Sequence, residues 1–281
     1  MLPEQIKLWK LPSLAAISSL FVHVRTHEQA KASHEAFRYL LTNTPRLDDL
    51  SVCRDFTENF PLTDWHASLA SVLPLRLDVS SPLVLKHLEL GDLRLGESSR
   101  ALLHEIDISR LEGLHIHDCV EVTPFLSALS SLFSRAKPSL RRLNVSSNER
   151  LPILGALDAF LQTWRGLRTI VICMPLQNLV PKEGIMHHTD TLRLLLLGDV
   201  ADRYQEPYNL NVMDILKKCS RLQEVAINLG PYDLGHWLDT APSYHLEKKD
   251  DNVLPFSREA VMESLETQRS QDATDVEPSS G

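Results

Sequence analysis

Four residues between positions 87 and 117 have side chains that could hold a metal ion or titrate near neutral pH: His87, Glu89, His115 and His117. Imidazole and carboxylate groups are suitable zinc ligands, so a zinc site is possible here. The four residues form no ligand motif, however, and a polar surface needs no metal. We therefore expect no cofactor and no bound metal, and favour weak, pH-sensitive binding of a partner, because imidazole changes charge between roughly pH 5 and 8.

A second histidine cluster, His187-His188 with Asp190, resembles an acid-base pair or a set of metal ligands. We expect a solvated loop instead, because the rings of adjacent histidines point apart. The sequence contains no GxGxxG, phosphate loop, HExxH or GxSxG motif. We therefore predict that the chain is not an enzyme and has no catalytic residues.

A repeated strand must position the first histidine group. In one copy, Leu114 and Ile116 point to the same side of a short strand, while Leu111 and Cys119 turn into the same core where the chain enters and leaves it. This spacing is typical of one turn of a leucine-rich repeat. The same apolar triplet recurs as Ile17/Leu20/Val22, Leu47/Leu50/Val52, Leu85/Leu88/Leu90, Leu140/Leu143/Val145, Leu167/Ile170/Ile172, Leu192/Leu195/Leu197 and Leu222/Val225/Ile227.

The first anchors of these units are 25 to 38 residues apart. Most steps fall at or just beyond the upper end of the roughly 20 to 29 residues expected of leucine-rich repeats. The longest step implies an insertion around residues 61–81. We predict an α/β fold, a right-handed leucine-rich-repeat solenoid or horseshoe, with a parallel β-sheet on the concave face and helices outside. Helices are expected over residues 28–41, 98–106, 153–164 and 211–218, near His187, and after Thr123-Pro124, where Thr123 would cap the helix.

Residues between the anchors must line the concave sheet. They form three rows: Ser19, Asp49, His87, Gly113, Arg142, Thr169, Leu194 and Glu224; then Phe21, Ser51, Glu89, His115, Asn144, Val171, Leu196 and Ala226; then His23, Cys53, Gly91, His117, Ser146, Cys173, Gly198 and Asn228. We expect a protein partner on this face, at His87, Glu89, His115, His117, Arg142, Asn144, Thr169, Val171, Leu194 and Leu196.

The middle of the face is polar, whereas its later part is apolar through Val171, Leu194, Leu196 and Ala226. An exposed apolar patch commonly marks an interaction site. We favour a partner there, and the alternative is that residues 233–238 fold back, with Trp237 covering the patch.

The chain of 281 residues carries a formal net charge of -8, which argues against general nucleic-acid binding. It has no apolar run of the roughly 18 residues needed to span a membrane, and its first residues do not form a signal peptide. We expect a cytoplasmic or nuclear protein. The cysteines Cys53, Cys119, Cys173 and Cys219 form no CxxC pair, so buried thiols are expected.

Three domains are predicted. Residues 1–229 form the solenoid. Residues 230–269 form a C-terminal cap that covers the last open coil and includes a short helix begun by Ser257. Residues 270–281 are polar and form a disordered tail.

Leu111, Leu114, Ile116, Cys119, Val122 and Thr123 resemble the cysteine-containing leucine-rich repeat, LxxLxLxxC followed by an apolar residue and Thr, of F-box proteins in cullin-RING ubiquitin ligases. The segments Thr44-Pro45-Arg46 and Lys137-Pro138-Ser139 are similar to helix ends in fungal F-box and leucine-rich-repeat proteins. Leu140 to Asn148 carries the full LxxLxLxxN form of the repeat. The resemblance covers about residues 11–229, and no F-box is visible, although Leu2 to Ile6 is similar to an F-box opening.

This resemblance implies a protein-protein interaction module that recognises substrates within an F-box-type ubiquitin ligase. A cullin adaptor subunit would be a further partner if the full gene encodes an F-box. The alternative is a stand-alone leucine-rich-repeat scaffold or regulator, for example of a small GTPase, with no ubiquitin link. Neither interpretation involves nucleic acid or a membrane.

Overall fold

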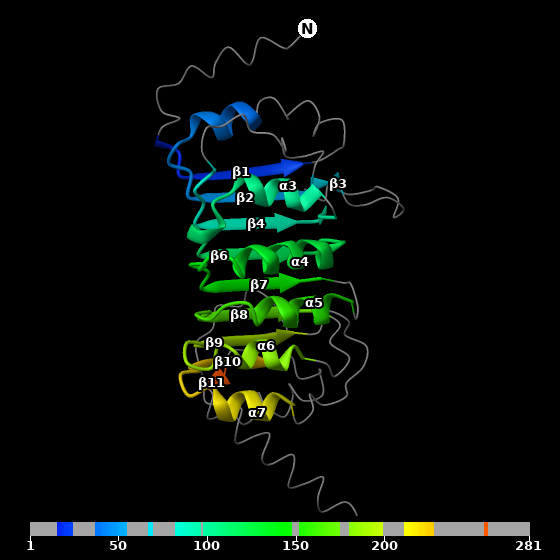
Figure 1. Cartoon of the computed structure of the whole chain (residues 1–281), viewed down its shortest axis with the longest axis vertical. Coiled ribbons are helices and arrows are strands. Elements are labelled where there is room, and N and C mark those ends of the chain that lie inside the picture. Colours follow the sequence, from blue (N-terminus) through cyan, green and yellow to red (C-terminus); the bar gives the residue numbers. More distant parts are fainter. Residues whose placement is uncertain are drawn as a thin grey trace, which may run out of the picture.

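The protein is built on one long sheet with helices packed against one face (Figure 1). The computed structural model describes residues 16–24, 37–54, 67–69, 82–96, 98–147, 152–174, 180–198, 211–227 and 256–257. Eight strands run parallel and follow one another in sequence order, which confirms the predicted α/β class and parallel sheet. They are β1 (Ser19–Val24), β2 (Asp49–Arg54), β4 (His87–Gly91), β6 (Gly113–His117), β7 (Arg142–Ser146), β8 (Thr169–Cys173), β9 (Leu194–Gly198) and β10 (Glu224–Ile227).

Side chains alternate strictly between the two faces of these strands, because successive residues of a strand point to opposite sides. On β7 the buried positions are Leu143 and Val145, whereas Arg142, Asn144 and Ser146 are exposed or half-buried. Leu143 pairs with Leu114 of β6 and with Ile170 of β8, and all three side chains are fully buried. The predicted ladder of apolar anchors is therefore present.

A repeated backbone contact fixes the start of each strand. Arg141 and Arg142 both donate their N–H groups to the carbonyl of Glu112, at 2.8 and 3.0 Å, and Arg168 and Thr169 donate in the same way to Arg141. The carbonyls of Ser18, Asp48, Lys86, Arg168 and Arg193 accept equivalent pairs. Because each unit is held to the preceding one at the same position, the strands keep a common register, an arrangement compatible with a solenoid.

The helices that connect the strands pack on one another in chain order (Figure 1). They are α3 (Ser98–Glu105), α4 (Val122–Phe133), α5 (Pro152–Leu161), α6 (Lys182–Met186) and α7 (Asn211–Lys218), and residues 37–43 are also helical. The helices predicted over residues 98–106, 153–164 and 211–218, near His187 and after Thr123-Pro124 are present, with shifts of a few residues at their ends, and the helix predicted over 28–41 is described from residue 37. Ser257, predicted to begin a short C-terminal helix, is the last residue of a two-residue strand, and the residues after it lie outside the described part of the chain.

The predicted cap of α4 is wrong. The helix begins at Val122, so Thr123 lies inside its first turn. The hydroxyl of Thr123 is buried without a hydrogen-bond partner among the described atoms. The residue before the helix, Glu121, has a left-handed conformation with φ of 57° and makes no side-chain cap.

The predicted insertion coincides with a second, small sheet. Within it, β3 (Ala67–Ser68) pairs in parallel with β5 (Leu93–Arg94), and Leu69 is fully buried. The extra residues of the longest step therefore add a short strand that lies beside the segment following β4.

At the other end, β11 (Phe256–Ser257) pairs antiparallel with β10 through Val225 and Glu224. This contact covers part of the edge where the sequence predicted a cap near Trp237. The rest of the predicted cap and tail, including Trp237, lies outside the described residues, as does Asn148, the last residue of the LxxLxLxxN form. Among the helices that the structure describes, none is long and apolar enough to cross a membrane.

Candidate functional site

All ten predicted partner-binding residues lie on the face of the sheet turned away from the helices, which we call the helix-distal face. The strand register confirms the three predicted rows, apart from Asn228, which lies outside the described residues. His87, Gly113, Arg142, Thr169 and Leu194 are consecutive partners in one row, and Glu89, His115, Asn144, Val171 and Leu196 in the next. His117 belongs to the third row, between Gly91 and Ser146.

Two glycines on this face make room for imidazole rings. A Cβ on Gly91 would overlap the ring of His117 and lie 2.9 Å from the sulfur of Cys53, and a Cβ on Gly113 would overlap the ring of His87. Neighbouring strands of a sheet lie only about 4.8 Å apart. A ring that covers the adjacent strand can therefore lie flat only where that strand carries no side chain.

Over Gly113, the ring of His87 belongs to a group that we call the Asp49 group: Ser19, Asp49 and His87. The Ser19 hydroxyl donates to Asp49 Oδ2 at 2.7 Å, and His87 Nδ1 lies 2.5 Å from Asp49 Oδ1. Partial burial acts to raise the pKa of Asp49, but its hydrogen bonds with Ser19 and His87 outweigh this and hold the pKa below its ordinary value.

Over Gly91, the ring of His117 belongs to the Cys53 group: Cys53, Glu89 and His117. His117 Nε2 lies 3.4 Å from Cys53 Sγ and 3.5 Å from Glu89 Oε1. The three ligand atoms lie within 4.8 Å of one another, and all three residues are half-buried. Burial raises the pKa of the Cys53 thiol and outweighs the opposing hydrogen bond from Ser51, and the Glu89 carboxylate raises the pKa further.

Neither group has the geometry of a nucleophile with its base. In the Asp49 group the carboxylate stands between the hydroxyl and the imidazole, so His87 does not take the proton of Ser19. In the Cys53 group the thiol and the carboxylate both approach Nε2 of His117, whereas a relay uses the two ring nitrogens separately. A raised thiol pKa also opposes thiolate formation.

The three histidines that the sequence analysis grouped with Glu89 therefore make separate contacts. His87 turns toward β2, His117 turns toward Cys53 and Glu89, and His115 is exposed between them. The partner of His87 is Asp49 and a partner of His117 is Cys53, and neither Asp49 nor Cys53 belonged to the predicted site. Cys53 and Cys173 are half-buried, so only Cys119 and Cys219 match the expectation of buried thiols.

The apolar zone is less accessible than predicted. Val171, Leu194 and Leu196 are half-buried, and Ala226 is only 4% exposed. The register of these residues is as predicted, so the difference lies in how deeply they sit between neighbouring side chains. A different residue of the middle row, Phe21 on β1, is 66% exposed.

A column of arginines follows the edge of the same sheet. Arg141, Arg168 and Arg193 occupy the same position in three consecutive units, immediately before β7, β8 and β9, and all three are exposed. Arg142 is exposed beside them at the first position of β7. Cationic groups on adjacent strands repel one another, so this column favours a negatively charged group placed against it.

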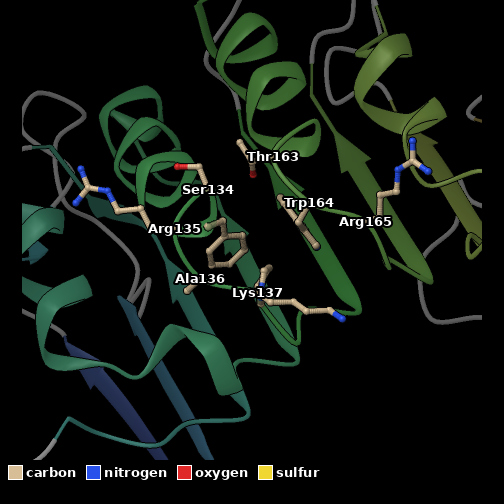
Figure 2. Close-up of a pocket in the computed structure, with 9 residues that line it drawn as sticks. Ser134, Arg135, Ala136, Lys137, Thr163, Trp164 and Arg165 are labelled. Atoms are coloured by element: carbon tan, nitrogen blue, oxygen red, sulfur yellow. The ribbon is translucent and has the colours of Figure 1, made fainter.

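A shallow hollow of about 350 Å³ lies where α4 and α5 end (Figure 2). Phe133 and Trp164 pack edge to face in its wall, with ring centroids 4.9 Å apart. Figure 2 shows Arg135 and Arg165 extending in opposite directions, so the two guanidinium groups do not converge on one ligand. The lining residues are Phe133, Ser134, Arg135, Ala136, Lys137, Pro138, Thr163, Trp164 and Arg165.

The expectation of a solvated loop at His187-His188 is wrong for His188. The turn after α6 places the His188 side chain in the core, 1% exposed, with its ring centroid 5.5 Å from that of Trp164. Its Nδ1 accepts the backbone N–H of Leu167 at 3.4 Å, and its Nε2 is buried without a hydrogen-bond partner among the described atoms. Burial, reinforced by the neighbouring His187, lowers the pKa of His188 to about 4.

No protein-family model and no curated protein matches this chain significantly. The assignment of function therefore depends on the arrangement of the residues themselves.

Sequence reasoning missed the Cys53 group because its members come from separate units, and no short motif contains them. The signal that could have revealed it lies in the third row, where Gly91 stands between Cys53 and His117. The arginine column could have been found in the same way, by aligning the residue that precedes each row.

Proposed function

We propose that this chain is a right-handed leucine-rich-repeat solenoid that binds another protein on its helix-distal face, as the substrate-recognition part of an F-box-type ubiquitin ligase. The observation that carries the binding role is the common register of the strands from β1 to β10, which presents three rows of side chains on one continuous face. Such extended faces are the binding surfaces of solenoid proteins.

The link to F-box proteins rests on the cysteine-containing repeat. Cys119 is 1% exposed, and its thiol donates to the carbonyl of Leu90 in the preceding unit at 3.4 Å. Burial raises the pKa of Cys119 to about 12, so the thiol stays protonated and inert. A structural role for this cysteine agrees with its place in the resembled repeat.

The arginine column borders the helix-distal face at the start of β7, β8 and β9, and it favours an acidic partner that reaches this edge. Arg141, Arg168 and Arg193 are exposed, strand-spaced cations on a chain whose formal net charge is -8. An acidic segment that runs across the strands would place one carboxylate near each guanidinium, and arginine pairs with carboxylates in a bidentate manner. We therefore propose an acidic protein segment as the partner, in the cytoplasm or nucleus.

Two experiments on the product of the complete gene test the proposal. Co-purification with a cullin adaptor subunit, together with accumulation of a bound protein when the gene is deleted, would support the ligase role. A bound protein without the adaptor would leave the stand-alone scaffold. The triple variant Arg141→Ala/Arg168→Ala/Arg193→Ala should lose the bound protein, whereas Arg135→Ala/Lys137→Ala, which removes exposed cations next to the hollow, should retain it. If the triple arginine variant retained the bound protein as fully as the control variant does, the proposed surface would be refuted.

A further inference from the structure

The Cys53 group has the composition of a metal site. A thiol, an imidazole and a carboxylate converge from three successive strands: Cys53 on β2, Glu89 on β4 and His117 on β6. Zinc accepts all three ligand types, whereas calcium and magnesium require oxygen ligands almost alone. The mixture of donors therefore favours zinc or a similar transition-metal ion.

Two of the three distances between the donor atoms agree with the edges of a tetrahedral zinc site. Zinc bonds of about 2.3 Å to sulfur and about 2.0–2.2 Å to nitrogen or oxygen imply tetrahedral edges of about 3.4–3.6 Å. The corresponding separations are 3.4 Å between Cys53 Sγ and His117 Nε2, and 3.5 Å between His117 Nε2 and Glu89 Oε1. The third separation, between Cys53 Sγ and the Glu89 carboxylate, is within 4.8 Å, and any excess over a tetrahedral edge would be taken up by the flexible Glu89 side chain.

Gly91 makes this convergence possible. Cys53 and His117 are both partners of Gly91 in the third row, so they lie on strands that are two positions apart, about 9.6 Å in the pairing direction. Any side chain at position 91 would fill the space that the imidazole ring occupies. Gly91 has no positive φ, so other residues could adopt its backbone conformation. Glycine is required here because it has no side chain, which leaves room for the imidazole ring.

Nearby groups suit a bound cation. The hydroxyl of Ser51 lies 3.4 Å from the sulfur of Cys53, where it can orient the thiolate as outer-shell groups do at metal sites. Asp92, at the end of β4, is buried and interacts electrostatically with both Cys53 and His117. Asp92 therefore adds a carboxylate near the three ligands, with Arg54 as an opposing charge beside it.

We propose that Cys53, Glu89 and His117 form a binding site for one zinc-class divalent ion, with the fourth coordination position open toward the helix-distal face. Three protein ligands with an open position are the pattern of zinc sites that bind water or an external group. The half-burial of the three ligands leaves the ion accessible from this face. An oxygen, nitrogen or sulfur atom from outside the chain would complete the tetrahedron. The inference concerns the chain alone and does not depend on the proposed ligase role.

The direct test uses the full chain, stripped with a chelator and loaded with Zn²⁺ or with Co²⁺ as a spectroscopic probe. We expect one ion per chain, and for Co²⁺ a thiolate-to-metal charge-transfer band together with the intense visible bands of tetrahedral geometry. The band should disappear in Cys53→Ala and persist in Cys173→Ala. Cys173 is the matched control, because it is half-buried in the same row beside Gly198, as Cys53 is beside Gly91.

The affinity for Zn²⁺, measured by competition with a chromophoric chelator, should fall more than about tenfold in His117→Gln and Glu89→Gln, since even the loss of an outer-shell partner costs 10- to 100-fold. Gly91→Ala should also weaken binding more than about tenfold although every ligand remains, and Gly198→Ala should not. Circular dichroism and the melting temperature identify any variant that has failed to fold.

Three results would overturn the assignment. The first is the absence of a stoichiometric ion in the wild-type chain. The second is a charge-transfer band that survives in folded Cys53→Ser or Cys53→Ala. The third is unchanged zinc affinity in Gly91→Ala or His117→Gln, because His117 would then not reach the ion across Gly91.

Discussion

The buried imidazole of His188 gives the protein a pH-dependent stability whose size follows from its surroundings. The ring is 1% exposed, and its pKa is about 4 in the folded chain, against an ordinary value of 6.5. The unfolded state therefore takes up a proton on this histidine at a pH where the folded state does not. The contribution to stability is complete above pH 6.5, is lost as the pH falls from 6.5 toward about 4, and then levels off.

The difference of about 2.5 pKa units corresponds to about 3 kcal/mol, at about 1.4 kcal/mol for each unit. His188→Asn removes the titrating group and keeps an acceptor near the position of Nδ1, which receives the N–H of Leu167. The variant loses packing against Trp164 at every pH. The informative quantity is therefore the difference in unfolding free energy between wild type and variant, which should shrink by about 3 kcal/mol between pH 7.5 and pH 4.

Urea denaturation followed by tryptophan fluorescence and circular dichroism at several pH values measures this difference. His104→Asn, at an exposed position on α3, is the control and should leave the pH dependence of wild type unchanged. If the wild-type and His188→Asn curves stay parallel from pH 7.5 to 4, the imidazole is not buried as a neutral group in the folded protein, and the argument is refuted.

Three further substitutions test other parts of the structure. Leu143→Ala leaves a cavity in the middle of the apolar ladder and should lower the unfolding free energy by about 2–5 kcal/mol in urea, and an unchanged midpoint would contradict the register. Asp92→Asn should stabilise the chain by roughly 1–2 kcal/mol at pH 8 and not at pH 3.5. Burial raises the pKa of Asp92 to about 6, so above that pH the folded chain carries a buried carboxylate whose ionisation costs stability, and Asn removes this cost; equal melting temperatures of wild type and variant at pH 8 would argue against it. Gly113→Ala should displace the ring of His87, and NMR titration should then show a higher pKa for Asp49, because one of the hydrogen bonds that lower it is lost; a pKa that does not move would mean that the ring is held elsewhere.

The rows on the helix-distal face could be predicted from the sequence because they follow from two rules. Side chains alternate along a strand, and equivalent residues of stacked units become neighbours. Once Leu114 and Ile116 are placed in the core, His115 must point the other way, and the partner of His115 in the next unit must be Asn144. Neither step requires knowledge of side-chain conformations.

The contacts within the rows could not be predicted in this way. The rows place His87 and His115 on adjacent strands, yet the ring of His87 turns to Asp49. It does so because Gly113 leaves space on one side of the ring and Asp49 offers an acceptor on the other. Cys53 lies 36 residues before Glu89 and 64 before His117 in the sequence. Spacing rules for metal ligands, which compare residues within short motifs, do not connect such distant positions.

The environment of His188 also depends on information that local sequence does not contain. Adjacent histidines followed by Thr and Asp have the composition of an exposed turn, and the turn is present. The side chain is buried because Trp164, at the end of the preceding unit, leaves space for a flat ring beside its indole. Packing between units therefore overrides the local polarity of this segment.

Glycine has a specific consequence on a sheet of stacked units. In a regular row each side chain meets those about 4.8 Å away on the adjacent strands, and a side chain between them separates residues two strands apart. A glycine removes that barrier, so residues about 9.6 Å apart in the pairing direction come into contact without any change in the backbone. In the third row, Gly91 allows such a contact between Cys53 and His117. Further along the same row, Cys173 is again followed by a glycine, Gly198. The next position of the row, 228, is an asparagine. The second pair therefore lacks the imidazole that gives the first its three-strand cluster, which is why Cys173 and Gly198 serve as controls for Cys53 and Gly91.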